Sequence, residues 1–299
     1  MSLLNKLVVT ALPIIPRSII GQISKRYIAG ITIHDAVRVI RGLNQKEMMA
    51  TLDLLGEDIQ EQREALENRS NIVGMFQEIQ RSGLDSNVSV KLTQFGLRIN
   101  KNLCYENVKT IVENARDLKN FVRIDMEDST TTTETIEIFR RLREAGYDNV
   151  GLVLQAYMRR SEADIRSLAP LKPNIRLCKG IYIEHRDIAF KERDEIRKNF
   201  LHLLQLIVEN GSYVGIATHD DYLVDKSYEL IQEHSLKRHQ FEFQMLLGVR
   251  EQLRGEIVRR GHRLRVYVPY GEKWYAYSTR RLKENPQMAW YITRAMFGR

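Results

Sequence analysis

The most informative stretch of this sequence lies near its carboxyl end and reads YGEKWYAYSTRRLKENP (residues 270–286). In a helix that ends at the proline, an aromatic ring, two guanidiniums and a carboxylate share one face: Tyr277, Arg280, Arg281 and Glu284. A guanidinium is permanently charged, and its planar fork matches a carboxylate through hydrogen bonds worth about 1.5 to 3 kcal/mol each. This face indicates a grip on an anion. The alternative is a solvated helix edge with an Arg281–Glu284 ion pair.

The elements that must position this face form a regular pattern. Eight short apolar runs alternate with segments suited to helices, at residues 49–55, 88–93, 121–127, 149–157, 175–180, 213–220, 240–246 and 263–269. The helical segments between them include 57–81, 133–145, 186–209 and 222–234. Eight strands close a parallel barrel, so the sequence predicts an α/β fold, a (β/α)8 barrel. We expect an N-terminal helical arm over 1–45 and the barrel over 46–299.

The polar residues of the runs predict where the site lies. In the run 88–93, Val88 and Val90 alternate with Ser89 and Lys91, as in a strand with two different faces. The polar residues increase toward the carboxyl ends, at Lys91, Asp125, Gln155, Tyr157, Lys179, His219, Gln244 and Tyr267. The carboxyl ends form the active-site mouth of such barrels. We therefore expect a polar cup at that end, resting on an apolar base.

The composition narrows the class of protein. Of the 299 residues, 43% are hydrophobic and 28% are charged, which is ordinary for a globular protein. Cys104 and Cys178 lack the spacing of a disulfide framework, a zinc site or an iron–sulfur cluster, so we expect a reducing, cytoplasmic location and no metal.

The excess positive charge lies at the two ends. The net charge is +8, and residues 1–34 hold four basic residues without an acid, while 280–299 hold five against Glu284. Basic ends that carry apolar residues favour peripheral contact with an anionic membrane surface or a partner over nucleic acid. Lys6, Pro13, Pro16 and Arg17 interrupt the apolar amino terminus, so it predicts an amphipathic arm, with a targeting peptide as the alternative.

The residues alone leave the chemistry open. The sequence contains no GxGxxG, P-loop, GxSxG or HExxH motif, and His219 has no second histidine at ligand spacing. Lys91 and Lys179 at strand ends suit a Schiff-base lyase, because a buried lysine with a lowered pKa can attack a carbonyl. A flavin or similar redox reaction is the other candidate, and the arginine pair indicates only a substrate with a carboxylate or phosphate.

Nine motifs in order carry a resemblance to a known family. They are LDLLGE (52–57), VSVKLTQFGL (88–97), RIDMED (123–128), LQAYMRR (154–160), RLCKGIY (176–182), IATHD (216–220), FEFQMLLGV (241–249), YVPYG (267–271) and YSTRRLKEN (277–285). With them the chain resembles the proline dehydrogenases in their short monofunctional bacterial form, from Arg26 to Ala295.

The resemblance implies a distorted (β/α)8 barrel that holds FAD without a dinucleotide fingerprint, with its last helix over the mouth. It implies oxidation of L-proline to 1-pyrroline-5-carboxylate, with a quinone as electron acceptor and a separate 1-pyrroline-5-carboxylate dehydrogenase as a further partner. Arg280 and Arg281 would clamp the proline carboxylate, in a pocket completed by Lys91, Asp125, Tyr182, Leu246, Tyr267, Tyr277 and Glu284. The residues that would contact the cofactor are Gln155, Arg176, Lys179, Gly180, Thr218, His219 and Arg281.

The chain departs from the family pattern after Gly180, where it reads IYIEHRD. Ile181 stands where a small alanine is usual, and His185 where proline is common. We expect Ile181 to narrow the pocket wall and His185 to change the following loop.

Overall fold

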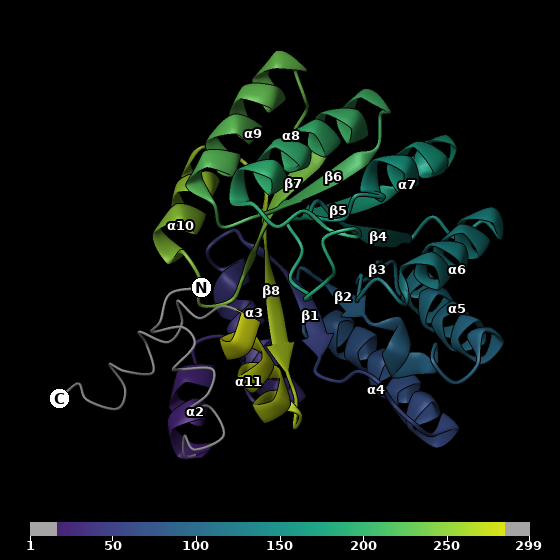
Figure 1. Cartoon of the computed structure of the whole chain (residues 1–299). Helices are drawn as coiled ribbons and strands as arrows, with labels where there is room; N and C mark the ends of the chain where they lie inside the picture. The colour runs from purple at the N-terminus through teal and green to yellow at the C-terminus, as the bar shows by residue number, and fades with distance from the viewer. Residues whose placement is uncertain (1–16, 285–299) are drawn as a thin grey trace.

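The computed structural model describes residues 17–284 (Figure 1). Eight parallel strands close into a barrel in chain order. They are β1 Met49–Leu54, β2 Ser86–Val90, β3 Val122–Ile124, β4 Val150–Gln155, β5 Asn174–Cys178, β6 Tyr213–Ala217, β7 Phe241–Leu246 and β8 Leu264–Tyr270. Each predicted apolar run overlaps one strand, so the predicted (β/α)8 barrel is confirmed.

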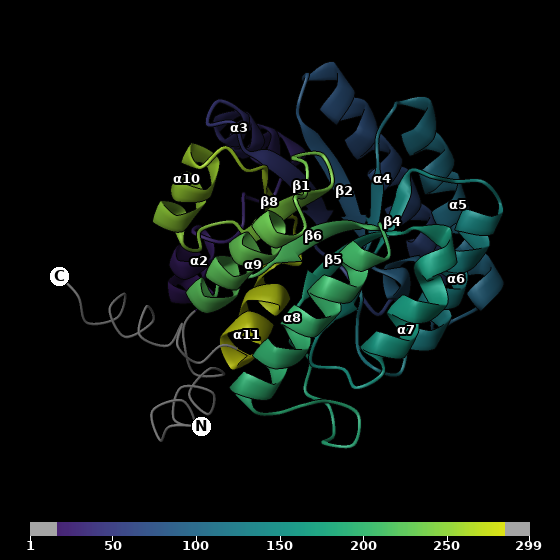
Figure 2. The same ribbon diagram turned by 90° about the horizontal axis from the view of Figure 1, so that it is seen from above.

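Helices cover the outside of the barrel (Figure 2). Those between strands are α4 Gln62–Arg81, α5 Lys101–Asp117, α6 Thr132–Glu144, α7 Ser161–Leu168, α8 Arg193–Glu209, α9 Asp221–Glu233 and α10 Glu251–Arg259, with short 3-10 turns η2 Leu92–Phe95 and η3 Ala169–Leu171. The predicted helix 186–209 begins only at Arg193. The preceding loop follows the chain after β4 instead, since Ala189 forms an antiparallel bridge with Met158 and the Phe190 N–H donates to Tyr157 O.

The alternation within each strand separates two environments. Val88 and Val90 belong to the apolar core under the helices, whereas Ser89 between them points into the barrel. Its hydroxyl lies 3.2 Å from Nη1 of Arg176 on β5, and Arg176 also reaches Thr51 on β1. Contacts between strands that are not neighbours can form only across the interior, so Ser89, Arg176 and Thr51 all point inward.

The prediction that the base of the barrel is apolar is wrong. At the amino ends of the strands the interior holds Arg123, Glu242 and Arg265, which are 1%, 2% and 9% exposed. Arg265 Nε donates to Glu242 Oε1 at 2.6 Å, so two of these charges satisfy each other. The apolar phase of each strand faces the helices along its whole length, which leaves the polar phase to fill the interior at both ends.

Two helices before β1 complete the fold, α2 Arg17–Ser24 and α3 Ile33–Asn44. Thr32 and Asp35 form a capping box that starts α3, and its apolar face packs on β8 and β1. α3 thereby packs beside β8, in the place that the helix following this strand would occupy in a regular (β/α)8 barrel.

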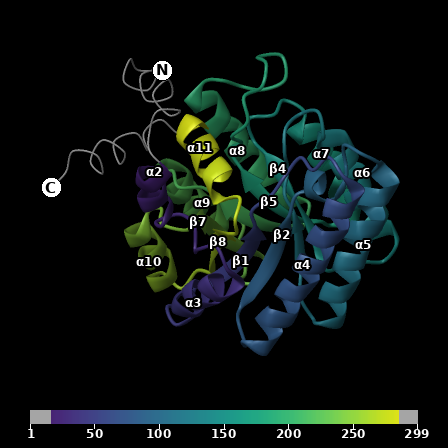
Figure 3. The same cartoon turned by 90° about the horizontal axis from the view of Figure 1, so that it is seen from below.

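The last described helix, α11 Trp274–Glu284, follows β8 and lies over the carboxyl-terminal mouth beside α2 (Figure 3). Ser24 Oγ and Ser278 Oγ, 2.6 Å apart, join the two helices. Within residues 17–284, none of the helices has the length and apolar content needed to cross a bilayer.

Candidate active site

A cluster of charged side chains lies inside the carboxyl-terminal end of the barrel. Lys91 follows β2, Asp53 lies on β1, Asp125 follows β3 and Tyr267 lies on β8. The Lys91 Nζ is 3.0 Å from Asp53 Oδ1, 3.9 Å from Asp125 Oδ2 and 3.4 Å from the Tyr267 hydroxyl. The Tyr267 hydroxyl in turn donates to Asp125 Oδ2 at 2.8 Å. The barrel thus brings Lys91, Asp125 and Tyr267 together as the sequence predicts.

The electrostatics of this cluster fix its charge state at neutral pH. Burial lowers the pKa of an ammonium, but the carboxylates of Asp53 and Asp125 outweigh burial and raise the pKa of Lys91. Burial raises the pKa of Asp53, which is 0% exposed, although Lys91 opposes the shift. Burial and the Asp125 carboxylate also raise the pKa of the Tyr267 hydroxyl. Lys91 therefore stays protonated and Tyr267 stays a hydrogen-bond donor.

Arg176 extends the cluster toward the middle of the barrel. Its Nη1 donates to Asp125 Oδ1 at 2.7 Å, and its Nε donates to Gln244 Oε1. Its guanidinium carbon lies 5.4 Å from the centre of the Tyr267 ring. Arg176 thus positions the Asp125 carboxylate. Its contact with the cofactor stays a prediction.

Gln155, at the end of β4, presents an unused acceptor. Its side chain is 3% exposed, and Nε2 donates to the carbonyls of Met126 and Glu127 at 3.1 and 2.9 Å. These two carbonyls fix the orientation of the amide. The buried Oε1 has no hydrogen-bond partner among the described residues. A donor on a bound molecule would satisfy it.

A second charged group surrounds Asp220 after β6. Arg197 on α8 donates to both carboxylate oxygens at 2.9 and 2.6 Å, and Lys179 Nζ lies 3.2 Å from Oδ2. Burial would raise the pKa of Asp220, but Arg197 and Lys179 lower it to about 2. Thr218 Oγ1 accepts the Asp220 N–H at 3.2 Å. Lys179 is therefore held at the mouth with its ammonium paired.

His219 and Gly180 shape the backbone of the mouth. His219 Nε2 accepts the Leu246 N–H at 2.9 Å, so the neutral ring carries its proton on Nδ1. Gly180 has φ +104°, and a Cβ at this position would lie 2.2 Å from the Tyr157 ring. Only glycine fits there, because the Tyr157 ring fills the space that a side chain would need and the backbone has a positive φ.

The remaining predicted residues lie on α11 and on the loop after β5. Tyr277 is half-buried and close enough to Tyr267 to contribute to its raised pKa, and Tyr182 acts in the same way on Lys91. The backbone of Arg280, Arg281 and Glu284 lies in α11, but their side chains are outside the described part of the structure, so the clamp stays a prediction.

The two departures from the family pattern lie on an exposed loop. Ile181 and His185 are both exposed. The predicted effect of Ile181 on the pocket wall therefore stays untested.

Sequence reasoning missed Asp53, Asp220 and Arg197. Asp53 was detectable, because it occupies an inward position of the run 49–55 in the same alternation that identified Lys91. Asp220 follows His219 directly and had no separate signal. Arg197 lies on a helix, where nothing in the sequence marks the residue that turns toward a strand end.

Among the residues that the structure describes, no three acidic, histidine or cysteine side chains come together as metal ligands.

Together these features define a (β/α)8-barrel enzyme with a charged site at the carboxyl ends of its strands. The model of the family "Proline dehydrogenase" matches residues 36–293. The chain is 40% identical over 261 residues to proline dehydrogenase 2 of Bacillus subtilis, covering 87% of this chain and 86% of the relative. It is 34% identical over 279 residues to proline dehydrogenase of Deinococcus radiodurans, covering 92% and 90%. The chain belongs to the proline dehydrogenase family.

Solved structures agree on the fold. Proline utilization A from Bdellovibrio bacteriovorus, inactivated by N-propargylglycine, superposes with a TM-score of 0.83 at 24% identity. The match covers 93% of this chain and 34% of that one, so the chain spans about a third of this longer protein.

Proposed function

We propose that this protein oxidises L-proline to 1-pyrroline-5-carboxylate, the first step of proline catabolism, with FAD as its cofactor. The observation that carries the proposal is the cluster of Lys91, Asp53, Asp125 and Tyr267 in the barrel mouth of a chain from this family. The cluster combines an ammonium, carboxylates and a hydroxyl at fixed positions, and such groups can bind the two charges of an amino acid zwitterion.

Three features of the mouth support a flavin. The buried Oε1 of Gln155 has no hydrogen-bond donor in the described part of the chain, and the imide N–H of an isoalloxazine ring would supply one. Gly180 lets the chain turn at φ +104° directly against the Tyr157 ring, which fixes the shape of the backbone beside the proposed cofactor site. Lys179 and His219 line the same end of the barrel, and a cation there would stabilise negative charge on a reduced ring. When bound, FAD accepts the hydride that leaves the ring carbon beside the proline nitrogen.

The side chains of the cluster then have separate tasks. We propose that Arg280 and Arg281 hold the proline carboxylate, with Lys91 as a further cation below them. Tyr267 and Leu246 would form the wall against which the ring lies flat, as a near-attack geometry requires. Arg176 keeps the Asp125 carboxylate in place through its 2.7 Å hydrogen bond. Loss of the hydride and of the proton on nitrogen leaves the C=N bond of the product.

The Schiff-base lyase fits less well. An amine nucleophile must be neutral, so it needs a lowered pKa, whereas the neighbouring carboxylates raise the pKa of Lys91. Borohydride treatment with a keto acid tests this alternative, and a stable adduct on Lys91 or Lys179 would favour it.

The partners follow from the proposed chemistry. A reduced flavin needs an acceptor, and we propose a membrane quinone reached through the basic ends of the chain. The product would pass to a separate 1-pyrroline-5-carboxylate dehydrogenase. The chain covers only 24% of its bifunctional relative PutA from Escherichia coli, so that relative has ample length for a second activity.

Steady-state turnover tests the proposal. The purified protein, reconstituted with FAD, is supplied with L-proline and a quinone analogue, and the product is identified by mass as proline minus two hydrogens. Turnover with L-proline but not with a keto acid is the expected result. A protein that is loaded with FAD yet forms none of this product would contradict the proposal.

A further inference from the structure

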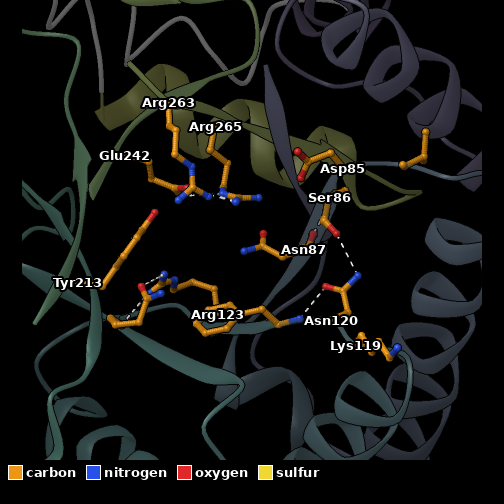
Figure 4. A pocket seen from close by; sticks show the side chains of 13 residues that line it. Asp85, Ser86, Asn87, Lys119, Asn120, Arg123, Tyr213, Glu242, Arg263 and Arg265 are labelled. Carbon is orange, nitrogen blue, oxygen red and sulfur yellow. Dashed lines mark hydrogen bonds and ion pairs between the residues drawn. The ribbon is translucent and has the colours of Figure 1, made fainter. Parts of the chain in front are cut away.

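The opposite end of the barrel contains a cavity that the proposed reaction does not use. It has a volume of about 430 Å³ and lies at the amino ends of the strands, far from the carboxyl-terminal mouth (Figure 4). Its charged lining consists of Asp85, Lys119, Arg123, Glu242, Arg263 and Arg265. Four of these six side chains are basic, so the lining has an excess of positive charge.

Arg123 is the most deeply buried charged member of this lining, and within residues 17–284 no carboxylate pairs with it directly. It is 1% exposed and donates to the carbonyl oxygens of Leu152 and Asn174 at 3.1 and 2.6 Å, and to the Asn174 side chain. Its Nε has no hydrogen-bond partner among the described residues, and none of their carboxylates lies within ion-pair distance. Phe121 covers one face of the guanidinium at 5.0 Å. All its direct contacts are therefore neutral.

The surroundings of Arg123 make its positive charge energetically unfavourable. Burial and the nearby Arg176 lower the pKa of Arg123 to about 9, since both disfavour the cation. It remains protonated at neutral pH, so the structure holds a buried charge without a direct ion pair. The carboxylate of Glu242 raises the pKa of Arg123 and so compensates its charge in part, but Arg265 binds both oxygens of that carboxylate, at 2.6 and 3.2 Å.

Arg263 adds a second cation at the cavity rim. Its side chain is 29% exposed and lies 3.7 Å from Glu242 Oε2, at the edge of ion-pair distance. The same carboxylate is already bound by Arg265, so Arg263 is only weakly engaged. In Figure 4, Arg263 and Arg265 lie on one side of the space and Arg123 on the other, with Asn87 between them. An oxyanion between the two sides would meet guanidiniums from both.

We propose that this cavity is a second binding site, which takes a small doubly charged oxyanion between Arg123 and Arg263. The ligand supplies the direct ion pair that the Arg123 guanidinium lacks among the described residues, and the hydrogen bonds that it accepts are charge-assisted. The chemistry fits a phosphoryl group or a dicarboxylate equally. The site is separate from the proposed proline site and does not depend on the proposed reaction.

Calorimetric titration of the full-length, FAD-loaded protein tests the proposal with two probes, inorganic phosphate and succinate. At least one probe is expected to bind, and the one that binds identifies the ligand class. Arg263→Gln is expected to weaken binding about tenfold or more, as the loss of one charge-assisted contact implies. Arg123→Lys retains the charge but loses the fork, and is expected to weaken binding too.

Two controls locate the binding. Arg259→Gln makes the same charge change on the exposed end of α10, outside the cavity, and should leave the affinity unchanged. Loss of binding in Arg280→Ala/Arg281→Ala instead of Arg263→Gln would place the anion at the mouth and overturn the proposal. No binding of either probe, or equal affinities for Arg263→Gln and Arg259→Gln, would overturn it as well.

Discussion

Replacing Lys91 with methionine tests how the charged cluster in the mouth is held together. Methionine keeps the length and the apolar stem of lysine but removes the ammonium that lies 3.0 Å from Asp53 and 3.9 Å from Asp125. Asp53 is 0% exposed and its second oxygen has no hydrogen-bond partner within residues 17–284, so its buried charge would lose the cation that pairs with it. Breaking a buried ion pair from one side costs about 3 to 5 kcal/mol of unfolding free energy.

The loss of stability in Lys91→Met should depend on pH, and the direction of this dependence follows from the pKa of Asp53. Burial already raises the pKa of Asp53, and removing Lys91, which lowers it, must raise the pKa further. A carboxyl whose pKa is raised in the folded state destabilises the fold as the pH rises above the pKa that the same carboxyl has in the unfolded chain. The Lys91→Met variant should therefore lose more stability relative to the native protein at about pH 8 than at about pH 5.

Urea unfolding of the native and variant proteins at both pH values measures the effect. Lys109→Met is the matched control, because its 4.0 Å pair with Glu113 on α5 is exposed and should contribute little. The double variant Lys91→Met/Asp53→Asn removes both charges and should recover much of the loss. A loss no larger than that of Lys109→Met, or one that grows toward acid pH, would refute the reasoning.

Four further variants test the mouth. Gln155→Leu removes the unpartnered acceptor, so FAD affinity measured by fluorescence titration should fall about fivefold to tenfold, whereas an unchanged affinity would exclude the amide from the cofactor site. Gly180→Ala forces a Cβ to within 2.2 Å of Tyr157 at φ +104°, so we expect little FAD uptake in its visible spectrum, and normal loading would contradict the role of glycine. Arg280→Ala and Arg281→Ala should each lower kcat/KM for proline about tenfold to a hundredfold with circular dichroism unchanged, and native kinetics in both would exclude the clamp.

The barrel was predictable because its signal repeats. Eight apolar runs and the helices between them each point to the same fold, so an error at one boundary changes nothing. The helix 186–209 shows the limit of this reasoning. Its first residues are compatible with a helix, but two hydrogen bonds with the chain after β4 hold them in a loop until Arg193: the Phe190 N–H donates to Tyr157 O, and Ile188 O accepts the Arg159 N–H.

The site was predictable where it lies on strands. Lys91, Asp125 and Tyr267 occupy inward strand-end positions, and the barrel must bring such positions together. Arg197 was not predictable, because its contact with Asp220 depends on how α8 is rotated against β6. The charged base of the barrel was also missed. The alternation predicted an apolar base under the polar cup, whereas the structure buries the charged side chains of Arg123 and Glu242 there.

The central claim is that the mouth of this barrel holds a flavin and presents proline to it. An anaerobic visible spectrum of the FAD-loaded protein, recorded before and after L-proline is added, tests it most directly. We predict that the flavin absorbance bleaches with proline and returns when a quinone is supplied. A loaded protein whose flavin stays oxidised at saturating proline would contradict the claim.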